Sequence, residues 1–400
     1  MKGHRYWVAV VFFLLAAAPG CWWPALANTL EEYGLGRWVA TAFMIPNLAG
    51  MISPLIFGAQ VDQRWQAQKV LGWIMISGAG FLFMAFYSLE NQWGGGWFLF
   101  FFGINSLISA PAWSLLITIA LSNLPESGSH FGLYRVWGTL GWMAASFTVS
   151  FCNWDLSAKN GQLGAVIRIF AAITCFLLPV TEPKGEPAKH WSDAIGWRAT
   201  SLLKERDLFV YFLAAFLFTV PLGAFYMHTP MHLKELGASS ISSWMATGQI
   251  LETVAMLGMG YVIARFRVKS ILLMAMVCGV MRYAFYSVDG LFWLVVGIVL
   301  HGVCWTFFFE AGKVFLHRRV SQGIRGQAQA LLGFFTGGLG GTLGVLVVNA
   351  IHDWVYPVHG WSGYWMTLTG INTLVMIFFA LGYRGLPQQP PEPIDEPTMI

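Results

Sequence analysis

The stretch Glu182-Pro-Lys-Gly-Glu-Pro-Ala-Lys-His-Trp-Ser-Asp193 divides this sequence of 400 residues into two halves. It opens a polar segment, roughly 182–207, that ends on Lys204-Glu-Arg-Asp207. A run so rich in charge and proline is unfavourable inside a lipid bilayer, where neither charges nor free backbone groups find water. Because the chain on both sides is strongly apolar, this stretch indicates a hydrophilic linker between two hydrophobic halves.

Apolar segments of about 20 residues, the length that crosses a bilayer, lie on both sides of this linker. They fall near residues 6–27, 36–60, 70–90, 97–119, 133–153 and 164–181, and then near 208–229, 240–264, 270–287, 291–312, 326–349 and 361–383. We predict an all-α polytopic membrane protein with twelve transmembrane helices in two six-helix bundles. The predicted domains are the bundles 1–181 and 208–384, the cytoplasmic linker 182–207, and a proline-rich, acidic and disordered tail, 385–400.

The predicted location is the cell membrane, which is the inner membrane in a cell that has two. The placement of Lys and Arg predicts the orientation of the chain in it. With the N-terminus inside, 18 of the 23 basic residues fall at cytoplasmic ends and four (Arg37, Lys159, Arg168 and Lys234) at outer ends. Arg282 lies within a segment. Since cytoplasmic loops are enriched in Lys and Arg, both termini are predicted to be cytoplasmic.

The composition argues against several classes of function. Only 10% of the residues are charged and 56% are hydrophobic, with a net charge of +4 and no basic run, so no nucleic acid is expected as a partner. The sequence has no Walker loop, no paired catalytic carboxylates and no metal-ligand spacing among its five cysteines. We therefore expect no enzyme activity, no cofactor and no metal. The glycine-rich run Gly333–Gly344 lies in an apolar segment, where close helix packing is favoured over phosphate binding.

The loop after the second apolar segment reads Gly58-Ala-Gln-Val-Asp62-Gln-Arg64. It resembles the signature loop of the major facilitator superfamily, in which the pattern G-x-x-x-D-x-R closes the cytoplasmic side. The plan of six segments, linker and six segments also resembles that superfamily. The resemblance implies a carrier that works by alternating access, with Gly58, Asp62 and Arg64 in a gating loop, and by analogy a monomer.

Polar residues inside apolar segments are the candidates for a solute pathway. Arg135 leads a segment that continues through Thr139 to Trp142, whose ring suits stacking on a flat ligand. Gln249 and Glu252 are three residues apart and share one face of a predicted helix. A carboxyl group at mid-depth is costly when charged, which favours a proton-coupling role for Glu252 over a purely structural hydrogen bond.

Further candidates lie in the ninth and tenth segments. Arg282 is a candidate counter-ion for Glu252 or Glu310, whereas Glu310 and Lys313, three residues apart, predict a local salt bridge. His301 alone favours a satisfied core histidine. Phe307, Trp22 and Trp23 are further candidates for stacking on a ring.

Several of these stretches together resemble the nucleoside:proton symporter family of the major facilitator superfamily. They are Phe131–Trp142, Gly248–Glu252, Met281–Tyr283 and Leu300–Phe315. The resemblance implies that Arg135, Thr139, Gln249 and Glu252 line a central solute site. Family members carry an acidic residue at the position of Thr306, so we expect Thr306 to hydrogen-bond the solute and Glu310, four residues on, to compensate for the missing acid.

The function predicted from this resemblance is proton-coupled uptake of nucleosides or similar small polar solutes. The partners would be the solute, protons and the lipid bilayer. Arg135 and Trp142 also resemble a pair found in oligosaccharide:proton symporters, so a sugar carrier is an alternative, as is a drug or metabolite exporter of the same fold. A receptor or scaffold without flux is a third alternative.

Overall fold

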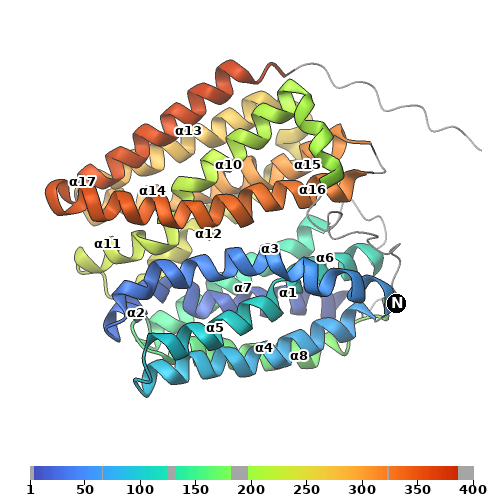
Figure 1. Cartoon of the computed structure of the whole chain (residues 1–400), viewed down its shortest axis with the longest axis vertical. Helices are drawn as coiled ribbons and strands as arrows, with labels where there is room; N and C mark the ends of the chain where they lie inside the picture. Colours follow the sequence, from blue (N-terminus) through green and yellow to red (C-terminus); the bar gives the residue numbers. More distant parts are fainter. Residues whose placement is uncertain (1–3, 65, 124–130, 182–196, 322–323, 386–400) are drawn as a thin grey trace, which may run out of the picture.

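The computed structural model describes residues 4–64, 66–123, 131–181, 197–321 and 324–385, and within these ranges it contains helices and no strand. The linker residues 182–196 and the tail residues 386–400 lie outside this description. Figure 1 shows the helices in two groups, α1 to α8 on one side and α10 to α17 on the other.

The first group contains eight α-helices and two short 3-10 turns. They are α1 (His4–Trp22), η1 (Trp23–Ala25), α2 (Leu26–Glu32), η2 (Gly36–Trp38), α3 (Val39–Arg64), α4 (Ala67–Glu90), α5 (Gly95–Ser109), α6 (Ala112–Asn123), α7 (Phe131–Phe151) and α8 (Lys159–Cys175).

The second group follows a 3-10 helix, η3 (Trp197–Lys204), and includes two π-helical segments, η4 and η6. Its elements are α10 (Arg206–Met227), α11 (Thr229–Glu235), α12 (Ile241–Arg265), α13 (Val268–Tyr286), α14 (Leu291–Cys304), η4 (Trp305–Glu310), α15 (Ala311–Arg319), α16 (Arg325–Gly333), η6 (Phe334–Gly340) and α17 (Gly341–Gly382).

Seven helical runs among the described residues are long and apolar enough to cross a membrane. The last of them, Arg325–Gly382, contains both of the final predicted segments and bends at Gly360, which has a φ of 60°. Such a positive φ suits glycine because it has no Cβ. The all-helical membrane class is therefore confirmed, and the count of twelve spans stays a prediction.

One placement by sequence was wrong. Arg168 was assigned to the outer end of a segment that begins near residue 164, but α8 begins at Lys159 and carries Arg168 in its interior, 6% exposed. The first turns of α8 contain the polar residues Lys159, Asn160 and Gln162. A hydropathy pattern marks only the apolar part of a span, so it placed the start of this helix too late.

Three apolar cores hold the helices together. One core joins both groups at the end of the molecule that carries η1, α2 and α11, with Trp22 and Phe43 from the first group beside Tyr283 and Trp365 from the second. At the other end each group has a core of its own, around Phe12 in the first group and around Phe218 in the second. Among the described residues, the apolar core is therefore shared by the two groups at one end and divided between them at the other.

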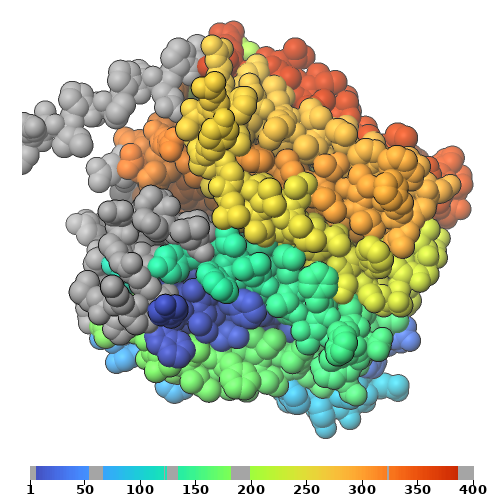
Figure 2. Space-filling view, turned by 180° about the vertical axis from the view of Figure 1, so that it is seen from behind, coloured from blue at the N-terminus to red at the C-terminus, as the bar shows by residue number. Residues whose placement is uncertain are grey.

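Between the groups, α7 packs against α12 and α3 against α17. Figure 2 shows α7, in teal, lying directly against α12, in yellow. The glycine-rich run packs as predicted, since a Cβ on Gly344 would lie 2.8 Å from the carbonyl oxygen of Val220 on α10, and one on Gly341 would lie 2.6 Å from Asn47 Oδ1 on α3.

Candidate functional site

A cavity of about 410 Å³ lies between the two groups of helices. Polar and aromatic side chains from both groups line it, which is the usual character of a small-molecule site. Among its lining residues are Trp113, Arg135, Thr139, Trp142, Tyr226, Gln249, Glu252, His301, Trp305, Glu310 and Lys313. Six of the residues selected from the sequence meet here: Arg135, Thr139, Trp142, Gln249, Glu252 and Glu310.

Helix α7 supplies the wall of the cavity on the side of the first group. Arg135, Thr139 and Trp142 are spaced by four and three residues, so they lie on one face of the helix. The Arg135 guanidinium lies over the Trp113 ring, 4.7 Å from its centroid. The Trp142 ring packs against Tyr226 of α10, with centroids 5.9 Å apart.

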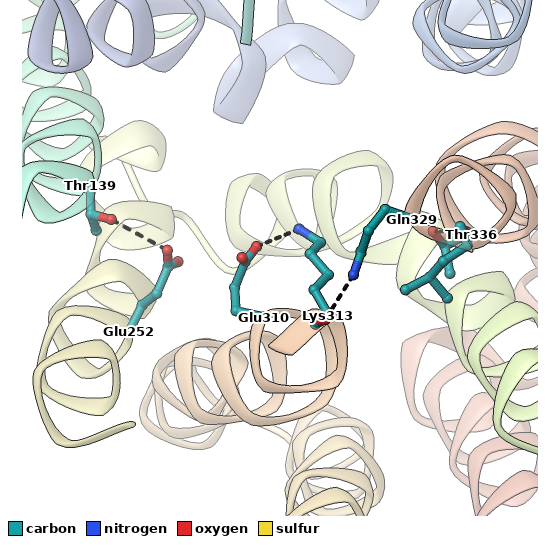
Figure 3. A network of polar contacts seen from close by, with 7 residues as sticks. Thr139, Glu252, Glu310, Lys313, Gln329 and Thr336 are labelled. Carbon is teal, nitrogen blue, oxygen red and sulfur yellow. Dashed lines mark hydrogen bonds and ion pairs between the residues drawn. The ribbon is translucent and has the colours of Figure 1, made fainter. Parts of the chain in front are cut away.

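Helix α12 supplies the carboxyl group that faces this wall. Glu252 is 6% exposed, and its Oε1 accepts a hydrogen bond of 3.4 Å from Thr139 Oγ1, so one contact joins the two groups across the cavity (Figure 3). Arg135 and Glu310 line the same cavity as Glu252. Gln249, one turn earlier on the same face of α12, lines it too.

The predicted salt bridge between Glu310 and Lys313 is confirmed. Lys313 Nζ lies 2.8 Å from Glu310 Oε1, and Gln329 of α16 donates a hydrogen bond of 2.8 Å to the carbonyl oxygen of Lys313. Figure 3 shows this chain of contacts beside the pair formed by Thr139 and Glu252. The contacts tie the cavity to α16.

Arg282 does not contact either carboxylate that the sequence suggested as its partner. Its Nη1 lies 2.8 Å from His301 Nδ1, and its Nη2 donates a hydrogen bond of 2.8 Å to the Tyr283 hydroxyl, which donates to the carbonyl oxygen of Pro221. The reason is geometric, because α13 packs behind α14 and His301 stands between Arg282 and the cavity. Arg282 therefore does not line the cavity itself but contacts His301, which does.

Thr306 and Phe307 do not line the cavity, contrary to the sequence-based prediction. Thr306 is fully buried, its hydroxyl has no hydrogen-bond partner among the described residues, and Phe307 belongs to the core of the second group. Both lie in the π-helical segment η4, whose wider turn changes which residues face inward. Trp305 and Glu310, at the two ends of this segment, line the cavity instead.

The side chains of Gly58, Asp62 and Arg64 lie outside the described residues, although the backbone places all three at the end of α3. Sequence reasoning missed Trp113, Tyr226 and Trp305. A usable signal existed for one of them, because Trp305 lies four residues after His301 and so shares its helix face.

Known proteins resemble this chain over nearly its whole length. Residues 4–387 match the model of the family described as nucleoside H+ symporter. YegT, a predicted nucleoside transporter of Escherichia coli K12, is 30% identical over 393 residues, covering 90% of each chain. The nucleoside permease NupG of the same organism is 25% identical over 393 residues, covering 91% of this chain and 93% of its own.

A crystal structure of a NupG variant superposes with a TM-score of 0.85 at 22% identity, covering 95% of this chain and all of the other. The likeness shows that both chains share the major facilitator fold. Family membership also confirms the prediction of a secondary transporter and not an enzyme. The chain belongs to the nucleoside H+ symporter family.

Proposed function

We propose that this protein takes up nucleosides together with protons, and that the cavity between α7 and α12 is the solute site. Arg135 and Gln249 would hydrogen-bond the solute, and the ring faces of Trp142 and Trp305 would pack against its base or ribose. Glu252 would accept hydrogen bonds from the solute when ionised and carry the proton when neutral.

The hydrogen bond between Thr139 and Glu252 is the observation that carries this proposal. It joins the two helix groups inside the cavity through the one carboxyl group that is held at mid-helix on α12. A solute or a proton that changes the charge or the partner of Glu252 therefore acts directly on the contact between the groups. This coupling is what a symporter needs, because both ligands must favour the same movement.

Alternating access would be a rocking of residues 1–181 against residues 208–384. The core shared at one end and the separate cores at the other support a state that is closed at the end of α2 and α11. The proposal also includes a monomeric carrier with twelve spans and with both termini on the cytoplasmic side of a cell inner membrane. It gives Gly58, Asp62 and Arg64 a gating role. Glu310 and Arg282 would act on coupling indirectly, through Lys313 and His301 respectively.

Uptake of labelled uridine into proteoliposomes, with and without an inward proton gradient, tests the proposal. We expect the wild type to concentrate uridine only with the gradient. Glu252→Gln keeps the size of the side chain but cannot exchange a proton, so its accumulation against a gradient should fall to background while solute exchange between the two sides persists.

Asp353→Asn is the matched control, because Asp353 is exposed and hydrogen-bonds Asn349 of its own helix. It should accumulate uridine as the wild type does. Gradient-driven accumulation by Glu252→Gln at the wild-type level would contradict the coupling role of Glu252, and an inert wild type would contradict nucleoside transport itself.

A further inference from the structure

The first group of helices contains a second cavity, of about 280 Å³, that the proposed mechanism does not use. We call it the side pocket and define it by the residues Trp22, Trp23, Asn105, Ser106, Ser109 and Arg168. It adjoins the central cavity, because Leu15, Pro19 and Trp113 line both. A solute in the central cavity therefore has the side pocket next to it.

Arg168 is the charged group of the side pocket. Its Nη1 donates a hydrogen bond of 2.5 Å to Asn105 Oδ1 and its Nη2 one of 2.6 Å to Ser109 Oγ. Its Nε has no hydrogen-bond partner, and no Asp or Glu forms an ion pair with it, among the described residues. An arginine held only for structure would have its donors and its charge satisfied, since a buried charge without a counter-charge is unfavourable.

Trp22 and Gly78 also lie next to Arg168 or its pocket. Trp22 Nε1, a donor that cannot accept, is buried and has no partner among the described residues. Gly78 on α4 leaves the space that the guanidinium occupies, because a Cβ there would overlap Arg168 Nη2. The pocket thus combines a positive charge with the side chains of three tryptophans, Trp22, Trp23 and Trp113.

We propose that the side pocket binds the carbonyl-bearing edge of a nucleobase, so that the carrier selects nucleosides with oxo groups over those with exocyclic amino groups. The inference rests on the proposed function and names its substrate class. A carbonyl oxygen accepts from the Arg168 guanidinium, whereas an amino group would place donor against donor. The tryptophan faces stack on the ring of the base.

Two matched pairs of nucleosides test this selectivity. Cytidine differs from uridine, and adenosine from inosine, by an amino group in place of an oxo group and by a ring-nitrogen acceptor in place of the neighbouring ring N–H. The inhibition constant of each for labelled uridine uptake is measured with the full-length protein in proteoliposomes, and its binding to purified protein by calorimetry. For the wild type we expect uridine and inosine to bind at least roughly tenfold more tightly than their amino counterparts.

Two substitutions locate the selectivity in the side pocket. Arg168→Gln should reduce both affinity ratios, uridine to cytidine and inosine to adenosine, towards one, mainly by weakening the binding of uridine and inosine. Gly78→Ala should do the same in part, because its methyl group displaces the guanidinium. Gly80→Ala, on the same helix and with nothing within 4 Å of its added Cβ, should keep both ratios.

The outcomes separate this inference from the function on which it rests. Equal affinity of wild type for both members of each pair would overturn the inference and leave nucleoside transport standing. Ratios that survive Arg168→Gln would overturn it as well. If Arg168→Gln does not fold, the wild-type ratios and the Gly78→Ala ratios decide. Failure of all four nucleosides to bind the wild type would overturn the proposed function, and the inference with it.

Discussion

At the scale of single residues, the Thr139 hydroxyl makes the hydrogen bond that joins the two groups of helices inside the central cavity. Its removal in Thr139→Val keeps the shape of the side chain and deletes the donor to Glu252. We expect uridine uptake to fall roughly threefold to tenfold, because one hydrogen bond between the groups is lost. Initial rates of uptake in proteoliposomes check the prediction.

Thr148→Val is the control on the same helix. Thr148 is exposed and its hydroxyl bonds only the carbonyl oxygen of Ala144, one turn earlier. It should leave uptake unchanged. Equal rates for wild type and Thr139→Val would mean that the bond across the cavity does not matter for transport.

At the scale of elements, the close approach of α12 and α14 sets the depth at which Glu252 lies. A Cβ on Gly302 of α14 would overlap the backbone nitrogen of Glu252 and lie 2.7 Å from its Cα. Gly302→Ala should therefore push the helices apart and destabilise the protein by about 1–3 kcal/mol. A lower midpoint of thermal unfolding in detergent, together with slower uridine uptake, is the expected result.

Gly258→Ala on α12 serves as the comparison, since nothing lies within 4 Å of its added Cβ. It should unfold at the wild-type temperature or slightly above, because alanine favours helix more than glycine does. A thermal midpoint of Gly302→Ala that equals that of Gly258→Ala would show that α12 and α14 can separate without cost.

At the scale of the whole molecule, Asp155 joins the two groups at their closed end. It lies between α7 and α8, 3% exposed, and its Oδ1 accepts hydrogen bonds from Ser150 Oγ at 3.1 Å and from the backbone nitrogen of Ser242 at 2.7 Å. Ser242 is at the start of α12, where the helix dipole favours an anion. The carboxylate thus holds the N-terminus of a helix that belongs to the other group.

We expect Asp155→Asn to weaken this contact by about 1 kcal/mol and so to enrich the state that is open at this end roughly fivefold. Spin labels at Gly96→Cys and Val358→Cys, one on each group, would report longer distances, in a background with the partly exposed Cys152 and Cys278 replaced. Asp353→Asn, at the same end but exposed, should leave the distances unchanged. An unchanged distance distribution in Asp155→Asn would show that other contacts suffice to hold this end closed.

Much of the molecule follows from sequence periodicity alone. Apolar runs of membrane-spanning length predicted the helical membrane class, because a bilayer requires long helices of apolar residues. Spacings of three and four residues placed Arg135, Thr139 and Trp142 on one face of α7, and Gln249 and Glu252 on one face of α12. These residues do meet in one cavity, since each face was correct and the two helices pack together. Their roles in transport stay predictions.

The sequence by itself therefore determined the class of protein and the two helix faces that form the central cavity, because each depends on a repeat along one chain segment. The family resemblance rested on particular motifs and not on a repeat. Only the tertiary structure decided the partner of Arg282, the burial of Thr306 away from the cavity, and the pocket around Arg168. These three depend on which helices pack side by side and on one wide turn in η4. Neither the packing of distant helices nor a single wide turn leaves a periodic signal in the sequence. Contacts between distant segments are fixed by packing in space and not by spacing along the chain.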